Sequence, residues 1–115
     1  MDRIYEKTML FDFYGELLTE HQRSVYRDAV YDDLSLGEIA DERGITRQGV
    51  HDMIRRCDRI LQEYENKLHL VERFAKARKT VGEIERLTTA AENDADRQEN
   101  LQDVRRLCQE LLNEL

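Results

Sequence analysis

Apolar residues recur at helical spacing along almost the whole of this chain. One seam runs through residues 2–17 and a second from residue 19 to about residue 31. From residue 57 onward, apolar residues continue at steps of three and four to about residue 91. No stretch alternates β-branched and aromatic residues as a strand would, and the chain contains no proline that would force a helix to break. The pattern therefore predicts an all-α protein.

Residues 35–57 have the pattern of two helices joined by a tight turn. Ser35 and Glu38 have the spacing of a capping box, so a helix should begin there. Gly44 can take the left-handed conformation that ends a helix, and Thr46 can cap the next one. The inner stripe of that second helix consists of Val50, Met53, Ile54 and Cys57. This combination predicts a helix-turn-helix.

The other predicted helix ends follow from similar local signals. Thr19 and Gln22 again have capping-box spacing. We expect the second helix of the helix-turn-helix to end between residues 65 and 69 and a further long helix to reach about residue 91. The polar run 92–97 predicts a break before a last helix. The predicted domains are a four-helix helix-turn-helix unit over residues 1–66 and long C-terminal helices over residues 67–115.

The last predicted helix carries an apolar seam that needs a partner. Heptad spacing links Leu101, Val104, Cys108, Leu111 and Leu115, with Leu107 and Leu112 beside them. The seam could fold back on residues 60–90 or meet the same helix of a second protomer. We favour a homodimer in which residues 67–115 form the dimerisation extension, because a small four-helix unit offers little surface to cover two further amphipathic helices.

The charge of the chain limits the classes of molecule that it can bind. A net charge of −7 argues against general affinity for nucleic acid, because phosphates repel acidic surfaces. The charge is uneven: residues 1–34 carry −4, residues 35–79 carry +2 and residues 80–115 carry −5. The only positive third contains the helix-turn-helix. This distribution favours a localised anion-binding patch.

The outer face of the second helix supplies candidate binding residues. In a helix-turn-helix this helix lies in the major groove, and its first residues reach base edges. Arginine and glutamine suit guanine and adenine, and later arginines can contact phosphates. The predicted nucleic-acid-binding residues are Arg47, Gln48, His51, Arg55, Arg56 and Arg59. Alternatively, the two helices pack around Ile45 as a scaffold that reads no nucleic acid.

The sequence offers no chemistry for catalysis. It has no glycine-rich phosphate loop, no cluster of metal-ligand spacing and no nucleophile motif, so we expect no enzyme, cofactor or metal site. No run of eighteen apolar residues is present, and the first residues lack a signal-peptide pattern. We therefore expect a cytoplasmic protein, with Cys57 as a small buried hydrophobe and a reduced thiol.

Three short runs resemble the fourth region of bacterial sigma factors, which reads the −35 promoter element. They are residues 18–23 (Leu-Thr-Glu-His-Gln-Arg), 34–40 (Leu-Ser-Leu-Gly-Glu-Ile-Ala) and 44–50 (Gly-Ile-Thr-Arg-Gln-Gly-Val). A resemblance to the YlxM-like family of small bacterial proteins is closer and covers nearly the whole chain. It is carried by Tyr5–Tyr14 and by residues 46–52 and 63–71.

This resemblance implies a regulatory or accessory role in the signal recognition particle pathway. The implied partners are nucleic acid, either the particle's RNA or DNA, and the particle's GTPase. A-form RNA has a deep, narrow major groove, so RNA binding would use the basic residues as phosphate contacts. The alternative is a protein–protein adaptor whose helix-turn-helix is only a scaffold. Salt dependence separates the two, because nucleic-acid binding weakens steeply as salt rises.

Overall fold

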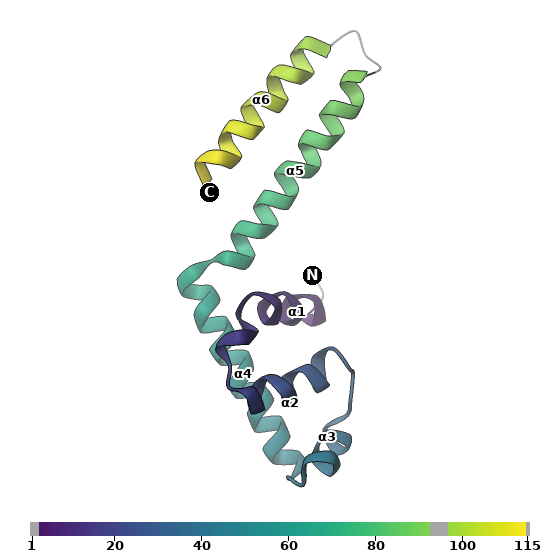
Figure 1. Ribbon diagram of the computed structural model, residues 1–115, viewed down its shortest axis with the longest axis vertical. Helices are drawn as coiled ribbons and strands as arrows, with labels where there is room; N and C mark the ends of the chain where they lie inside the picture. The colour runs from purple at the N-terminus through teal and green to yellow at the C-terminus, as the bar shows by residue number, and fades with distance from the viewer. Residues whose placement is uncertain (1–2, 93–96, 115) are drawn as a thin grey trace. The chain divides into compact units, whose positions relative to one another are not determined.

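The computed structural model describes residues 3–92 and 97–114, and all regular structure in these ranges is helical. This confirms the predicted all-α class. The helices form two compact units, Met1–Val71 and Glu72–Leu115. The division predicted between residues 66 and 67 falls within a helix, and the dimerisation role of the C-terminal part stays a prediction. In chain order the elements are α1 (Arg3–Tyr14), the 3-10 helix η1 (Gly15–Leu17), α2 (Glu20–Val30), α3 (Leu36–Arg43), α4 (Arg47–Leu68), α5 (Leu70–Glu92) and α6 (Arg97–Glu114) (Figure 1).

Local capping signals fix the start of three helices in the first unit. Both predicted capping boxes form, one at Thr19 before α2 and one at Ser35 before α3. Gly44 ends α3 in the left-handed conformation, with φ of 65°. The Thr46 hydroxyl accepts the backbone N–H of Gly49 at 2.9 Å and so caps α4. These contacts confirm the helix-turn-helix predicted over residues 35–57.

The first helix is shorter than its apolar pattern predicts. The pattern predicts one helix over residues 2–17, but α1 ends at Tyr14 and the 3-10 helix η1 follows; residue 2 lies outside the described ranges. Gly15 is buried, and a Cβ atom there would lie only 3.0 Å from the Phe11 ring. The tighter turn brings Leu18 into the core, where it is 4% exposed. The prediction was wrong because Tyr14 leaves the helical conformation, with φ of −121°, and its hydroxyl contacts Glu65 and Leu70, a tertiary packing that the apolar pattern does not reveal.

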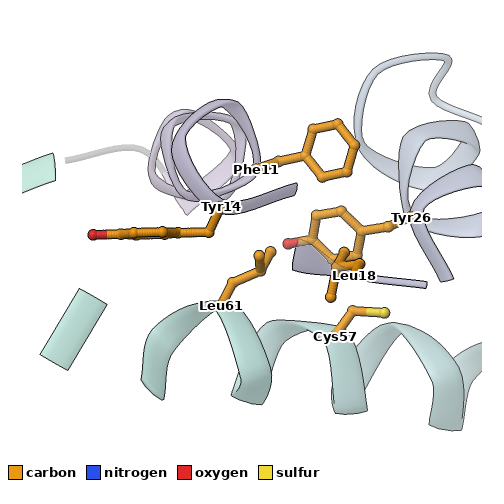
Figure 2. Packing of buried hydrophobic residues seen from close by; sticks show 6 residues of the cluster. All are labelled: Phe11, Tyr14, Leu18, Tyr26, Cys57 and Leu61. Atoms are coloured by element: carbon orange, nitrogen blue, oxygen red, sulfur yellow. The ribbon is translucent and has the colours of Figure 1, made fainter. Parts of the chain in front are cut away.

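The main core of the first unit joins α1, α2 and α4 (Figure 2). Figure 2 shows the Phe11 and Tyr26 rings above the α4 side chains Cys57 and Leu61; the two rings are stacked at 5.5 Å. Cys57 is fully buried, as predicted, and burial raises the pKa of its thiol to about 11. The group therefore stays a protonated thiol at neutral pH. The buried members of this cluster are Phe11, Tyr14, Leu18, Tyr26, Cys57 and Leu61.

A second apolar cluster holds the helix-turn-helix itself. Its buried members are Val25 of α2, Ile39 and Ala40 of α3, and Val50 of α4. Ile45, the apolar residue of the turn, packs against this cluster. Arg43 adds a polar link at the same place, because its guanidinium donates to Ser24 and Asp28 of α2 at 2.7 Å each. The first half of α4 is therefore fixed on α2 and α3.

The junction between α4 and α5 is held by a residue from α1. The helix α4 ends at Leu68, within the predicted interval, and His69 takes the left-handed conformation with φ of 57°. The Tyr14 hydroxyl donates to Oε1 of Glu65 at 2.6 Å and accepts the backbone N–H of Leu70 at 3.1 Å. The same Oε1 atom accepts the Val71 N–H at 3.0 Å. Two of the orphan donors at the start of α5 are thereby satisfied.

The second unit consists of most of α5 and the antiparallel α6 (Figure 1). The predicted break over residues 92–97 lies mostly outside the described ranges. The buried residues described in the second unit are Leu87, Ala91 and Leu107. The face of α6 that is covered within this unit is therefore centred on Leu107. Cys108 is exposed and Leu101 is 48% exposed. The predicted seam therefore gives only part of the helix face that is covered within this unit, and its last member, Leu115, is outside the described residues.

Candidate nucleic-acid interface

Two sides of α4 have opposite character. On the inner side, Val50, Cys57 and Leu61 are fully buried against the rest of the first unit. On the outer side, all six predicted binding residues are exposed: Arg47, Gln48, His51, Arg55, Arg56 and Arg59. The helix is thus anchored along one stripe and presents the other to solvent, as a recognition helix requires.

Five of the six predicted residues gather around one shallow hollow. It is lined by Gln48, His51, Asp52, Arg55, Arg56 and Arg59. Three arginines and a single carboxylate give this surface a positive charge, although the whole chain is acidic. Such a surface attracts anions.

Arg47 lies apart from that hollow. A Cβ atom at Gly37 of α3 would lie 3.0 Å from Nη2 of Arg47 and 3.1 Å from its Nε. The guanidinium therefore lies against the backbone of α3, where the absence of a side chain makes room for it. Arg47 remains exposed, but it lies along the neighbouring helix.

Asp52 organises the first turns of the outer face. Its Oδ1 atom accepts a hydrogen bond from Nε2 of Gln48 at 2.9 Å. Nδ1 of His51 lies 3.7 Å from the same oxygen, a distance beyond hydrogen-bond range. The two side chains form an ion pair only if the imidazole is protonated. Of the side chains on the outer face, Gln48 is therefore already engaged with a carboxylate of the protein itself.

Two functional candidates from α1 were missed by sequence reasoning. Arg3 and Lys7 line a second hollow together with five residues of α4: His51, Ile54, Arg55, Asp58 and Arg59. An adjoining hollow again contains Arg3, Lys7 and Arg59. The spacing of four residues between Arg3 and Lys7 places both on one face of a helix, which was the available signal. Sequence reasoning did not use this spacing, because residues 1–34 carry a net charge of −4 and so indicate an acidic region.

Asp58 sets the electrostatics of this second hollow. One carboxylate oxygen accepts the Tyr26 hydroxyl at 2.6 Å, and the other lies 3.4 Å from Nζ of Lys7. Burial, and then the hydrogen bond to Asp58, raise the pKa of Tyr26 above its ordinary value of 10.0. The tyrosine therefore remains a donor at neutral pH. The carboxylate is held in place and in turn positions Lys7.

The described residues offer little for other kinds of site. No group of three or more histidine, cysteine or acidic side chains among them is arranged to hold a metal ion. Within the same ranges, no helix is both long and apolar enough to cross a membrane.

Comparison with known proteins identifies the family. The family described as "UPF0122: Putative helix-turn-helix protein, YlxM / p13 like" matches residues 1–104. The chain belongs to this family. A UPF0122 protein of Shouchella clausii (strain KSM-K16) is 49% identical over 84 residues, which are 73% of this chain and 77% of the relative. UPF0122 proteins of Bacillus thuringiensis (strain Al Hakam) and Bacillus mycoides (strain KBAB4) are each 41% identical over 93 residues, or 81% of this chain and 84% of theirs.

Membership in the UPF0122 family confirms the resemblance found in the sequence. The matched range contains the whole first unit, with the helix-turn-helix and both hollows, and reaches into α6. The family description names a helix-turn-helix protein, which agrees with the geometry of α3, the turn and α4 in this chain.

Proposed function

We propose that this UPF0122 protein is a nucleic-acid-binding regulator that contacts backbone phosphates through the outer face of α4. The observation that carries the proposal is the exposed arginine group Arg55, Arg56 and Arg59 on a helix whose opposite side is fully anchored. Arginine presents a planar fork of donors that matches phosphate, and a rigid helix holds several such forks in fixed register. Binding rather than catalysis is the proposed activity, in the cytoplasm.

The same geometry favours phosphate contact over base reading. The two residues best suited to base edges, Arg47 and Gln48, are engaged with Gly37 and Asp52 of the protein itself. A base-reading role would require these contacts to be exchanged for contacts with a base. The arginines in the third and fourth turns of α4, Arg55, Arg56 and Arg59, have no such engagement among the described residues. We therefore expect binding that depends strongly on salt and weakly on sequence.

The accessory role in the signal recognition particle pathway is part of the proposal and rests on the YlxM-like resemblance. It selects the particle's RNA as the first target to compare with a DNA duplex. An A-form duplex is contacted through its phosphates and shape, which suits a face whose base-reading residues are occupied.

A titration of the full chain tests the proposal. The probes are a random DNA duplex, the signal recognition particle RNA and the particle's purified GTPase, each at about 50 and about 200 mM salt. We expect binding to nucleic acid that weakens steeply with salt. The variant Arg55→Gln/Arg56→Gln should lose it. The matched variant Lys67→Gln/Arg73→Gln removes two exposed charges that line neither the hollow of the outer face nor the one beside α1, and it should retain binding.

A protein-binding function is the second candidate, and the second unit favours it. Large apolar side chains there are 40–65% exposed: Phe74, Val81, Leu101 and Leu112. The first unit also exposes apolar side chains, so the candidate rests on the small core of the second unit, whose buried described residues are Leu87, Ala91 and Leu107. A homodimer that covers this unit is the partner we propose. Binding to the GTPase alone, unaffected by Arg55→Gln/Arg56→Gln, would replace the nucleic-acid function with that of an adaptor.

A further inference from the structure

We infer that the hollow between α1 and α4 is a phosphate-binding subsite, so that α1 is a second part of the nucleic-acid interface. The inference rests on the proposed function and deepens it. Its starting point is that Arg3 and Lys7 of α1 line the same hollow as Arg55 and Arg59 of α4. Residues about fifty positions apart in sequence thus supply one cationic surface.

Charge balance sets this hollow apart from an ordinary solvated helix face. Its lining contains four cationic side chains and one carboxylate, Asp58. That carboxylate is already shared between the Tyr26 hydroxyl and Lys7. Within the described ranges, no ion pair is recorded for Arg3, Arg55 or Arg59. Among the described residues that line the hollow, cationic side chains therefore outnumber carboxylates by three.

The contacts of Asp58 also order the site. The hydroxyl of the buried Tyr26 donates a hydrogen bond to one oxygen of the Asp58 carboxylate. The other oxygen forms an ion pair with the Lys7 ammonium at 3.4 Å. Lys7 is thereby kept at the hollow and gives up less side-chain freedom when an anion arrives. Asp58 acts here as a positioning residue.

The chemistry and the shape indicate the phosphates of a nucleic-acid backbone as the ligand. Arginine forks bind phosphate through two parallel hydrogen bonds, and a lysine adds a point charge. The hollow adjoins the one formed by Gln48, His51 and the arginines of the outer face, since both share His51, Arg55 and Arg59. A strand lying along α4 can therefore place one phosphate on the arginines of α4 and two neighbouring phosphates on Arg3 and Lys7 at the hollow between α4 and α1.

The test compares three variants of the full chain with the wild type. In Arg3→Gln/Lys7→Gln the hydrogen bond between Tyr26 and Asp58 remains, so the fold should be kept. Lys67→Gln/Arg73→Gln is the control with the same change of charge. Arg55→Gln/Arg56→Gln tests the proposed function, because both arginines line the hollow of the outer face; Arg55 also lines the hollow between α1 and α4. Each is titrated with a labelled DNA duplex and with the signal recognition particle RNA between about 50 and about 200 mM salt, and circular dichroism confirms folding.

Loss of two phosphate contacts has a defined signature. We expect Arg3→Gln/Lys7→Gln to bind roughly tenfold more weakly or worse, and its slope of log affinity against log salt to be shallower by about two for a duplex. The control should keep the wild-type slope. Should Arg3→Gln/Lys7→Gln misfold, the single variant Arg3→Gln, which breaks no hydrogen bond or ion pair among residues 3–92 and 97–114, should still reduce the slope by about one.

Two results would overturn the inference, and they differ from failure of the proposed function. Equal affinity and slope for Arg3→Gln/Lys7→Gln and the control, with Arg55→Gln/Arg56→Gln inactive, would remove α1 from the interface and leave the function of α4 intact. Displacement of the duplex by inorganic phosphate at constant ionic strength would show a free-anion site instead. If the wild type binds neither nucleic acid, the proposed function and the inference fail together.

Discussion

The two units of this chain differ in how much apolar surface they bury. Among the described residues, ten buried hydrophobic side chains lie in Met1–Val71 and three in Glu72–Leu115. The seven largest fully buried side chains all lie in the first unit. Helices are equally regular in both units, so regular secondary structure alone does not indicate where the stability resides. Tertiary packing, which supplies most helical stability, is concentrated around α4.

The second unit relies more on contacts within each helix. Ion pairs one turn apart join Lys76 with Glu72 and Arg106 with Glu110. Each pair on an exposed helix contributes only about 0.2–0.5 kcal/mol. Two helices with so small a core are marginal by themselves, because a small apolar core rarely offsets the entropy of ordering the chain. The comparison therefore predicts different behaviour when the units are separated.

Cutting the chain at the boundary should give the largest effect. The fragment 1–71 retains Leu70 and Val71, whose N–H groups bond to Tyr14 and Glu65, and we expect it to unfold cooperatively. The fragment 72–115 should be largely unfolded in dilute solution, and its helicity by circular dichroism should rise with concentration if it forms the proposed homodimer. Cooperative, concentration-independent unfolding of 72–115 would contradict the contrast drawn between the units.

A matched pair of leucine substitutions gives a smaller effect. Leu61→Ala removes a fully buried side chain of α4 and should lower the free energy of unfolding by about 2–5 kcal/mol. Leu107→Ala removes the buried leucine of α6 and should leave the main transition within about 0.5 kcal/mol of the wild type. Denaturant unfolding measures both, and hydrogen exchange should locate the Leu107→Ala effect in α5 and α6. Equal losses for the two variants would mean that the units unfold as one.

Alkaline pH should produce the smallest effect, confined to the first unit. Burial raises the pKa of Cys57 from 9.0 to about 11 and that of Tyr31 from 10.0 to about 12. The folded state holds both protons more tightly than the unfolded chain, so this stability is complete below pH 9 and is lost as pH rises toward 12. Denaturant titrations across this range measure the loss. Tyr31→Phe should reduce the loss at high pH without abolishing it, because the pKa values of Tyr14 and Tyr26 are raised as well. An unchanged pH profile in that variant would assign the loss to those two tyrosines and Cys57.

The sequence predicted those parts of the fold that short-range signals determine. Thr19, Ser35, Gly44 and Thr46 each act on backbone groups within a few residues, so their pattern alone locates the helix ends. The burial of Cys57 followed from its place on an apolar stripe. The end of α1 could not be predicted, because Tyr14 leaves the helix there and makes contacts with Glu65 and Leu70, which are distant in sequence.

The candidate site was predictable along one helix and not between helices. Helical spacing alone places all six predicted residues on the exposed side of α4. Arg3 and Lys7 join them only because α1 packs across α4, and no local pattern reveals that pairing. The engagement of Arg47 with Gly37 and of Gln48 with Asp52 was hidden for the same reason. The prediction therefore identified the binding helix but not the neighbouring residues that modify it.

The contacts of the Tyr14 hydroxyl also favour one order of assembly as the chain is made. The first two N–H groups of α5 find their partners on Tyr14 and Glu65, and His69 interrupts the helix just before them. During synthesis from the N-terminus, both partners leave the ribosome before Leu70 does. Once α1 has docked on α4, the start of α5 meets a ready-made template. The long C-terminal helix thus begins at a place that the finished first unit prepares for it.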